Sequence, residues 1–316
     1  HRCTIAPGGY GFCNVRYNDS GELKTFAYGE LISAAVDPIE KKPLYHFLPG
    51  STAFSVATVG CNFRCGFCQN WRISQVGLKD DHPSFGEPFT PEEVVEAALA
   101  QGSQTVAYTY TEPTIFYEYA YDISVAAVRR GLKNVFVTNG YMTRQMLDHA
   151  GAVLHGANVD LKSFSDDFYR RQCKGRLQPV LDSIVHMKAL GIWVEVTTLL
   201  VPGENDSEDE IRKIAAFIAE TGRDIPWHIS RFFPQYRMRD KEPTGLDILN
   251  RACEIGKEAG LRYVYRGNVG GESDTHCSSC GELLIKRSGF GVTEDRLTAE
   301  GTCPRCAAKL AGVFSP

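Results

Sequence analysis

The sequence predicts an α/β protein: a partial (β/α)6 TIM-like barrel with an N-terminal β-hairpin extension and a small C-terminal tail that binds a metal through four cysteines. Short β-branched and aromatic runs alternate with helix-like segments through the middle of the chain. The first fifty residues are rich in turn signals, and the last forty contain two cysteine pairs. We therefore expect an extension at 1–50, a barrel at 51–270 and a tail at 271–316.

The N-terminal extension should begin with a hairpin. Residues 13–17 and 22–28 are half-apolar runs on either side of a polar turn that ends in glycine. The segment 37–43 (DPIEKKP) contains two prolines and no periodicity, so we expect an irregular crossing segment there. Because the chain begins at His1 rather than at Met, we expect some N-terminal residues to be missing.

Six strands are expected in the central region, each followed by a helix-like segment. They lie at 53–59, 104–110, 134–138, 157–161, 193–200 and 227–233. A seventh strand is indicated at 262–266. Strands that alternate with helices form a parallel sheet, and short right-handed connections favour a barrel or partial barrel.

Capping residues indicate where several helices begin. Thr90-Pro91-Glu92-Glu93 combines an N-cap threonine, a proline at the first helical position and a glutamate that completes a capping box. Thr143, Ser207 and Thr244 are further candidate N-caps, because each precedes an apolar-periodic stretch.

Composition and charge narrow the function classes. The 316 residues are 43% hydrophobic and 23% charged, which excludes disordered, collagen-like and coiled-coil chains. No apolar run approaches the ~18 residues that a membrane span needs, so we expect a soluble, cytoplasmic protein without a membrane partner. The net charge of −4 indicates no nucleic-acid partner. Eleven cysteines at metal-ligand spacings indicate metal centres in a reducing compartment.

Three cysteines follow the first central strand at C-x3-C-x2-C spacing: Cys61, Cys65 and Cys68. On a loop that leaves a strand, their thiolates match three corners of a [4Fe–4S] cluster, which normally takes four. No fourth cysteine lies nearby in the sequence, so one iron would stay open to an outside ligand. A zinc site or buried thiols are the alternatives, but no residue of the loop supplies the fourth ligand that zinc would need.

At these residues the chain resembles the radical S-adenosylmethionine (SAM) enzymes, whose hallmark is C-x3-C-x-aromatic-C, with Phe67 as the aromatic residue. Within them it is most similar to the pyruvate formate-lyase-activating-enzyme branch, and specifically to the radical SAM member of the AmmeMemoRadiSam system. Three segments carry the closer similarity, followed by the two cysteine pairs: 37–47 (DPIEKKPLYHF), 61–70 and 263–271 (YVYRGNVGG).

The resemblance implies that the amino and carboxylate groups of SAM chelate the open iron. An electron from the reduced cluster then cleaves a C–S bond of SAM to give methionine and a 5′-deoxyadenosyl radical, which abstracts hydrogen. It implies no catalytic residue beyond the cluster and SAM. It also implies a protein substrate and a reductant such as flavodoxin or ferredoxin. Gly60 and Gly66 would offer N–H groups to the cluster sulfides. Phe63 and Phe67 would exclude water, a role that ordinary core packing also allows.

The resemblance further implies SAM contacts from five residues: Asn70, Glu112, Asn139, Asp160 and Lys162. The family's Gly-Gly-Glu-Pro is Tyr110-Thr111-Glu112-Pro113 here, so the carboxylate stays but both glycines are replaced. Val137 stands where an acidic residue often precedes Thr138-Asn139-Gly140, for which a plain turn is the alternative. Asp160 and Lys162 lie two positions apart on a strand, so both should face the barrel interior.

The last strands carry further polar residues. Glu195 and Thr197 should alternate inward, and Asn268 would lie near the adenine of SAM. We expect His228 to be a hydrogen-bonded core histidine, because the family's Pro-Tyr-His is Pro234-Gln235-Tyr236 in this chain.

The tail contains C-x2-C…C-x2-C, formed by Cys277, Cys280, Cys303 and Cys306. Two such knuckles give a tetrahedral sulfur site, in which zinc would be structural, as in a zinc ribbon, and a rubredoxin-like iron would deliver electrons to the cluster. Disulfides are the alternative. The tail has too few large apolar residues to fold by burial alone, so we expect a metal to stabilise it.

The remaining cysteines leave two readings. Cys3 and Cys13 are either half of a further metal site or buried thiols, and Cys173 and Cys253 should be isolated core residues. Three functions compete: a radical SAM enzyme that acts on a protein, one that acts on a small molecule, and an iron–sulfur electron carrier or zinc-ribbon adaptor that does not bind SAM.

Overall fold

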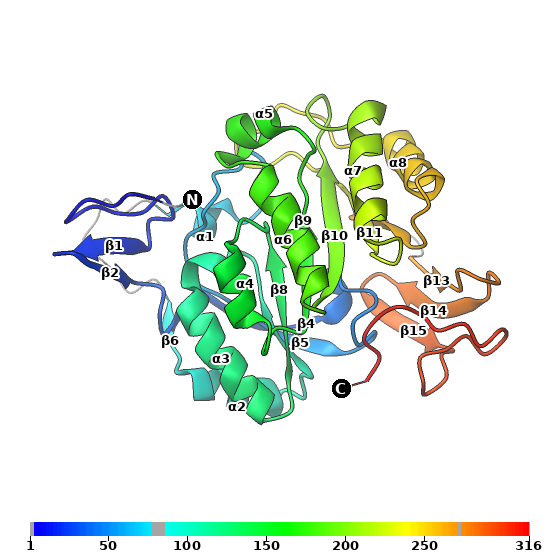
Figure 1. Cartoon of the computed structure of the whole chain (residues 1–316), viewed down its shortest axis with the longest axis horizontal. Coiled ribbons are helices and arrows are strands. Elements are labelled where there is room, and N and C mark those ends of the chain that lie inside the picture. The colour runs from blue at the N-terminus through cyan, green and yellow to red at the C-terminus, as the bar shows by residue number, and fades with distance from the viewer. Residues whose placement is uncertain (1–2, 77–85, 271–272, 316) are drawn as a thin grey trace.

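An eight-stranded sheet forms the centre of the protein within residues 3–76, 86–270 and 273–315, which this computed structural model describes (Figure 1). Its strand order is β12-β11-β10-β9-β8-β7-β5-β4, so neighbours in the chain are neighbours in the sheet. The sheet has two free ends, β4 and β12, and is therefore a partial barrel. His1 and Arg2, which precede Cys3, and Gly271, which ends the 263–271 segment, lie outside the described residues.

The seven predicted barrel strands are confirmed and run parallel to one another. They are β5 (Thr52–Ala57), β7 (Thr105–Tyr108), β8 (Lys133–Thr138), β9 (Gly156–Asp160), β10 (Trp193–Leu200), β11 (Trp227–Arg231) and β12 (Val264–Gly267). The sequence analysis did not find β4 (Ser33–Pro38), which pairs antiparallel with β5. Its small residues give a weak pattern, and the strand lies inside the segment expected as an N-terminal extension.

Helices cover the outer face of this sheet (Figure 1). The longer ones are α2 (Pro91–Ala100), α3 (Tyr117–Arg129), α4 (Arg144–Ala150), α6 (Gln178–Ala189), α7 (Glu208–Thr221) and α8 (Leu246–Glu258). Short helical turns follow several strands: η1 (Ile39–Lys41), α1 (Trp71–Ser74), η2 (Pro113–Phe116), α5 (Asp166–Phe168) and the π-helical η3 (Tyr169–Cys173). Among the described residues, no helix is long and apolar enough to span a bilayer.

The predicted helix caps are confirmed in three of four cases. Thr90 and Glu93 form the capping box of α2, and the side chains of Thr143 and Ser207 cap α4 and α7. The prediction for Thr244 is wrong, because Gly245 is the N-cap of α8. The buried Thr244 hydroxyl instead accepts from the Phe232 N–H and donates to the Leu200 carbonyl, so it ties two strand ends together.

The predicted N-terminal hairpin is also confirmed. It consists of β1 (Arg16–Asp19) and β2 (Glu22–Thr25), which project from one side of the barrel (Figure 1). Asp19 pairs with Glu22, which leaves Ser20 and Gly21 as a two-residue turn with φ values of 54° and 102°. Positive φ at both positions is typical of the type I′ turn that suits a hairpin. Two short strands, β3 (Glu30–Leu31) and β6 (Glu87–Pro88), pair nearby.

Residues 39–48 cross the base of the barrel, where the parallel strands begin. The Pro43 carbonyl accepts a 2.7 Å hydrogen bond from the side chain of Asn158 on β9. The backbone N–H groups of Tyr45 and His46 donate to the carboxylate of Glu195 on β10, at 3.0 and 2.8 Å. The expected crossing is therefore present from Ile39 onward, after Asp37 and Pro38 have completed β4.

The C-terminal tail packs beneath this crossing segment. It contains a three-stranded antiparallel sheet of β13 (Thr275–His276), β14 (Leu283–Ser288) and β15 (Gly291–Asp295). Arg287 is fully buried and donates to the Tyr45 carbonyl at 2.7 Å. Tyr45, Tyr263 and Tyr265 of the barrel also join the apolar cluster of the tail. The tail therefore shares its small core with the base of the barrel.

Candidate active site

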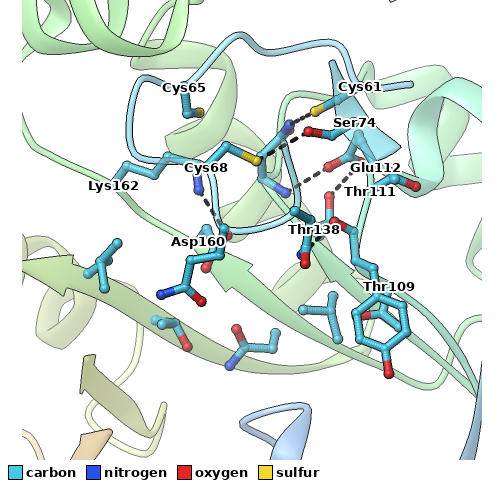
Figure 2. Close-up of a pocket in the computed structure, with 18 of the residues that line it drawn as sticks. Cys61, Cys65, Cys68, Ser74, Thr109, Thr111, Glu112, Thr138, Asp160 and Lys162 are labelled. Carbon is cyan, nitrogen blue, oxygen red and sulfur yellow. Dashed lines mark hydrogen bonds and ion pairs between the residues drawn. The ribbon is translucent and has the colours of Figure 1, made fainter. Parts of the chain in front are cut away.

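The three cysteines of the C-x3-C-x2-C motif lie on the loop between β5 and α1, at the carboxyl end of the barrel strands (Figure 2). Cys61, Cys65 and Cys68 all line one cavity of about 310 Å³. The loop is held by η3, because the N–H of Arg64 donates to the carbonyl of Cys173, the last residue of η3, at 2.9 Å. The three thiols thus face the cavity, while the backbone of their loop is hydrogen-bonded to η3.

The expected role of the two loop glycines is wrong. The N–H of Gly60 donates to the Ile73 carbonyl at 2.9 Å, and that of Gly66 donates to the Gln172 carbonyl at 3.1 Å. Neither N–H is therefore left for a cluster sulfide. Gly60 is needed for another reason: its φ is 94°, and a Cβ there would lie 2.8 Å from the Cys13 carbonyl oxygen.

Two phenylalanines form an apolar wall beside the thiols. Phe63 and Phe67 are buried and line the same cavity. Phe63 packs against Tyr141 and Tyr169, with ring centroids 5.1 and 6.0 Å apart, while Phe67 packs against Phe168 at 5.9 Å. Their packing is therefore both core packing and a barrier to water on this side of the loop.

The surroundings of the three thiols disfavour their ionisation unless a metal binds. Burial raises the pKa of Cys61 and Cys68, and the neighbouring Cys173 thiol together with burial raises that of Cys65. Three buried thiolates in one cavity need cationic metal to balance their charge, as the irons of a cluster do. Within the described residues, the only group of three or more potential ligands with donor atoms within 4.8 Å of one another is in the tail. The loop thiols are thus spaced too widely to share one ion.

Cys173 corrects a second prediction. It is fully buried, as expected, but it is not isolated, because its carbonyl accepts from the Arg64 N–H at 2.9 Å and its thiol helps to raise the pKa of Cys65. Cys65 and Cys173 are more than a hundred positions apart in the sequence, and no local pattern relates them. The π-helical turn η3 brings Cys173 under the cysteine loop.

Glu112 joins the ends of two strands at the cavity. One carboxylate oxygen accepts from the hydroxyls of Thr114 and Thr138, at 2.6 and 2.7 Å, and the other accepts from the Asn139 N–H at 2.8 Å. Burial raises the pKa of Glu112, which these hydrogen bonds oppose. Tyr110, at a position where related motifs have glycine, has a left-handed φ of 64°, so the backbone turn is retained despite the side chain.

Asn139 lies between Glu112 and the cysteine loop. Its side-chain N–H groups donate to the Asn62 carboxamide oxygen at 2.7 Å and contact the Cys61 sulfur at 3.8 Å. Asn70 also lines the cavity and donates to the Tyr110 carbonyl at 2.8 Å. The two asparagines therefore connect the cysteine loop to the ends of β8 and β7.

Asp160 and Lys162 face the cavity from the end of β9 (Figure 2). Both face inward, as the two-residue spacing predicts, and their side chains form an ion pair of 2.9 Å. Burial would lower the pKa of Lys162, but the negative charge of Asp160 and of neighbouring groups raises it well above its ordinary value. The Asp160 carboxylate therefore favours the charged form of Lys162 beside the thiols.

The polar residues of the last strands divide between the cavity and the base. Thr197 and Asn268 line the cavity. Glu195 faces inward but binds the crossing segment, and its carboxylate accepts from His228 at 2.6 Å. The prediction that His228 is a hydrogen-bonded core histidine is thus confirmed. The sequence analysis missed Lys42, which also lines the cavity and lies in a segment without periodicity.

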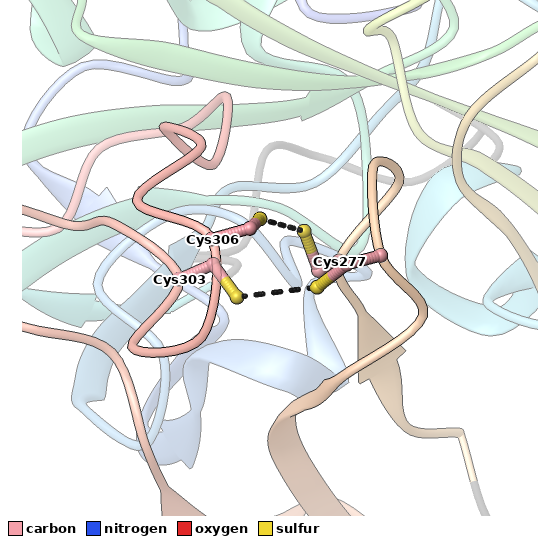
Figure 3. A group of neighbouring side chains, drawn as sticks. Cys277, Cys303 and Cys306 are labelled. Atoms are coloured by element: carbon pink, nitrogen blue, oxygen red, sulfur yellow. Dashed lines mark hydrogen bonds between the residues drawn. The ribbon is translucent and has the colours of Figure 1, made fainter.

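The four tail cysteines come together as predicted (Figure 3). Their ligand atoms all lie within 4.8 Å of one another, with Cys277 and Cys306 sulfurs 3.6 Å apart and Cys280 and Cys303 sulfurs also 3.6 Å apart. All eleven cysteines are free, so disulfides are absent from the described residues. This group could bind one metal ion, and it lies at the base of the barrel, whereas the cysteine loop lies at the opposite end.

The two N-terminal cysteines and Cys253 lie apart from these groups. Cys13 is buried against Val15 and Gly60, while Cys3 is exposed and accepts from the Phe12 N–H at 3.4 Å. Cys253 is half-buried on α8. The structure places Cys253 at the edge of the core and leaves both readings of Cys3 and Cys13 open.

A parallel barrel with thiols, carboxylates and an ammonium at the carboxyl ends of its strands is the architecture of a barrel enzyme. The sequence model of the Radical SAM superfamily matches residues 55–218, from the first parallel strand into α7. The chain therefore belongs to the radical SAM superfamily. It is a radical SAM enzyme, and membership implies a [4Fe–4S] cluster and SAM, with cleavage of SAM by a radical mechanism.

Known proteins resemble this chain to different degrees. An uncharacterised protein of Methanocaldococcus jannaschii is 45% identical over 312 residues, which cover 98% of this chain and 92% of the relative. The pyruvate formate-lyase-activating enzyme of Clostridium pasteurianum is 24% identical over 206 residues, covering 58% of this chain and 81% of that enzyme. A radical SAM methyltransferase structure from Sphaerobacter thermophilus has a TM-score of 0.53 at 17% identity and covers 75% of this chain and 71% of the other, a likeness of fold.

Proposed function

We propose that this chain is an activating-enzyme-like radical SAM enzyme that abstracts hydrogen from a protein substrate. The observation that carries the proposal is the single cavity that joins the cysteine loop to Glu112, Asn139, Asp160 and Lys162. Cys61, Cys65 and Cys68 would bind three irons of the cluster and leave the fourth for SAM. The bound cluster and SAM supply the 5′-deoxyadenosyl radical, while the protein positions the reactants and excludes water.

The cavity offers groups of both signs for a zwitterionic cofactor. Glu112 would attract the amino group of SAM, and Lys162 its carboxylate, while Asp160 holds Lys162 in place. Asn70 and Asn139 would add neutral hydrogen bonds near the cysteine loop, and Asn268 would approach the adenine. Asp160 and Lys162 share the end of β9, and each of the other residues lies at a different strand end or loop. A single bound SAM would therefore contact several strand ends around the rim of the barrel.

A protein substrate is supported by relatives that are named as activating enzymes. The open sheet, with unpaired edges at β4 and β12, is consistent with access for a polypeptide loop. A small-molecule substrate is the alternative, and the limited cavity volume of about 310 Å³ favours it. A reductant such as flavodoxin or ferredoxin would supply the electron.

The finer assignments belong to the same proposal. We assign the chain to the AmmeMemoRadiSam system from its 37–47 segment and its paired tail cysteines, and we place it in the cytoplasm because its cysteines are free. We also divide it into an extension at 1–50, whose β4 completes one edge of the central sheet, a barrel at 51–270 and a tail at 271–316. Zinc is the tail metal that we favour, because the tail lies at the end of the barrel away from the cysteine loop, which does not suit electron delivery.

The experiment that tests the substrate class compares two sets of additions under anaerobic conditions. The reconstituted, reduced enzyme is given SAM with purified candidate partner proteins or with pooled metabolites, and 5′-deoxyadenosine is quantified. Faster formation of 5′-deoxyadenosine with a partner protein supports the proposal. When that partner protein is deuterated, deuterium should appear in the 5′-deoxyadenosine. Acceleration by metabolites alone would replace the proposal with the small-molecule function.

A further inference from the structure

The cavity extends from the cysteine loop toward the base of the barrel, and the chemistry of its lining changes along the way. Besides the thiols and the rim residues, the lining includes Lys42, Tyr110, Asn158 and Thr197. Asn158 lies two residues before Asp160 on β9, so it faces the same way one layer closer to the base. Thr197 on β10 pairs with Asp160. Asn158 and Lys42 therefore lie below the rim residues that we assign to SAM, and Thr197 lies level with Asp160.

Two of these side chains have polar atoms without partners. Asn158 and Thr197 are only 1% and 8% exposed, and neither the Asn158 Oδ1 nor the Thr197 Oγ1 has a hydrogen-bond partner among the described residues. The Asn158 Nδ2 donates to the Pro43 carbonyl, which only accepts, so the orientation of the carboxamide is determined. Its free oxygen is therefore an acceptor that awaits a donor. Buried unpaired groups of this kind are rare in folded proteins and call for an explanation.

The third group is a cation. The Asp37 carboxylate binds the ammonium groups of Lys41 and Lys42, at 2.6 and 2.7 Å, and the Tyr110 hydroxyl. Two ammonium groups against one carboxylate leave a surplus positive charge. Lys42 also contacts the Tyr110 hydroxyl at 3.2 Å, which leaves one of its three N–H groups for a ligand. Burial lowers the pKa of Lys42 to about 8, so the amine is still protonated at neutral pH.

We propose that Lys42, Asn158 and Thr197 form a subsite for an amide unit of the substrate. The amide N–H would donate to Asn158 Oδ1, and the amide carbonyl, which has two lone pairs, would accept from both Lys42 and the Thr197 hydroxyl. A carboxylate would satisfy Lys42 but has no donor for Asn158, and an apolar group would satisfy neither. The inference rests on the proposed function, since a peptide group is the amide that a protein substrate brings.

The test uses one variant and one matched control. Thr197→Val removes a hydroxyl that has no partner in the described protein, so the fold loses no hydrogen bond. Thr105→Val is the control, because the Thr105 hydroxyl on β7 is also buried and without a partner among the described residues but does not line the cavity. Three small probes separate the chemistry: N-methylacetamide has a donor and a carbonyl, N,N-dimethylacetamide has no donor, and acetate has a charge and no donor.

Binding of each probe to the reconstituted enzyme with SAM is measured by ligand-observed NMR. We expect N-methylacetamide to bind the wild type and Thr105→Val equally, and Thr197→Val about five- to tenfold more weakly, the worth of roughly one hydrogen bond. N,N-Dimethylacetamide should bind the wild type at least about fivefold more weakly than N-methylacetamide. Equal binding of the three probes, or an unchanged affinity in Thr197→Val, would overturn the subsite.

A parallel assay keeps this inference separate from the proposed function. SAM cleavage is measured in the same three proteins without any probe. Cleavage of SAM by all three proteins, together with equal binding of the three probes to the wild type, would overturn only the subsite. Amide discrimination by a wild type whose reduced cluster gives neither cleavage nor an EPR response to SAM would support the subsite and contradict the radical chemistry on which its role in substrate binding depends.

Discussion

The Lys162 ammonium lies 2.9 Å from the Asp160 carboxylate, and both side chains line the cavity next to the cysteine loop. The Asp160 carboxylate thus holds the Lys162 ammonium in place beside the cavity. We predict that Lys162→Met lowers the affinity for SAM by about ten- to a hundredfold, because a charge-assisted hydrogen bond to a carboxylate contributes roughly 1.5–3 kcal/mol. Titration calorimetry with SAM and the reconstituted enzyme gives the dissociation constant.

The matched control for this prediction is Lys188→Met. Lys188 forms an ion pair with Asp224 at the same distance of 2.9 Å, but neither residue lines the cavity. SAM affinity should be unchanged in this variant. An equal loss in both variants would mean that general destabilisation, rather than a contact with SAM, explains the effect.

The Cys173 thiol raises the pKa of its neighbour Cys65, which the proposal assigns to the cluster. We expect the Cys173 S–H to donate to the Cys65 sulfur once that sulfur is a cluster ligand, which stabilises the reduced cluster, so Cys173→Ala should lower its reduction potential. A bond worth about 1 kcal/mol corresponds to roughly 40 mV for one electron. Spectroelectrochemical titration measures the shift, and Cys253→Ala, in a half-buried cysteine on α8, should leave the potential unchanged.

Removal of a tail ligand should unfold the tail first. In Cys277→Ala the four-sulfur site loses one ligand, and we expect loss of the metal and faster hydrogen exchange in β14, because the tail has little apolar core of its own. Metal analysis and hydrogen-exchange mass spectrometry check both. Unchanged metal content and exchange would refute a stabilising metal site.

The base of the barrel should be sensitive to acid. Burial lowers the pKa of His46 to about 4, and its ring contacts the Ala311 carbonyl and the Tyr265 hydroxyl, both at 2.7 Å. The unfolded chain binds a proton at this histidine below about pH 6.5, whereas the folded protein does so only near pH 4. The free energy of unfolding should therefore fall as the pH drops from 6.5 to 4, by up to about 3 kcal/mol from this group.

Urea unfolding at several pH values measures this dependence. His46→Gln retains a donor and an acceptor but does not titrate, so its stability should vary less between pH 6.5 and 4 than that of the wild type. His276→Gln, in an exposed position, should follow the wild type. The same pH dependence in His46→Gln and in the wild type would show that another group is responsible.

Local patterns explain what the sequence predicts well. The barrel strands, the Thr90 capping box and the inward direction of Asp160 and Lys162 depend on residues close together in the chain, and each is confirmed. Chemistry that depends on long-range packing was missed. The Cys65–Cys173 contact and the entry of Lys42 into the cavity arise only when η3 and the crossing segment fold against the barrel.

Two corrections have the same origin. The N–H groups of Gly60 and Gly66 are engaged by carbonyls from other parts of the chain, which the motif alone does not reveal. Thr244 has the residue type of an N-cap, but the neighbouring strand ends offer its hydroxyl a donor and an acceptor in the interior. In each case a tertiary partner outweighs the local signal.

The most direct test of the radical SAM assignment is the anaerobic formation of 5′-deoxyadenosine by the reconstituted, reduced enzyme with SAM. The control is the triple variant Cys61→Ala, Cys65→Ala, Cys68→Ala, with the EPR signal of the cluster recorded in the same samples. We predict 5′-deoxyadenosine and a SAM-dependent EPR change in the wild type and neither in the variant. An intact reduced cluster that gives no product and no EPR response to SAM would contradict the assignment.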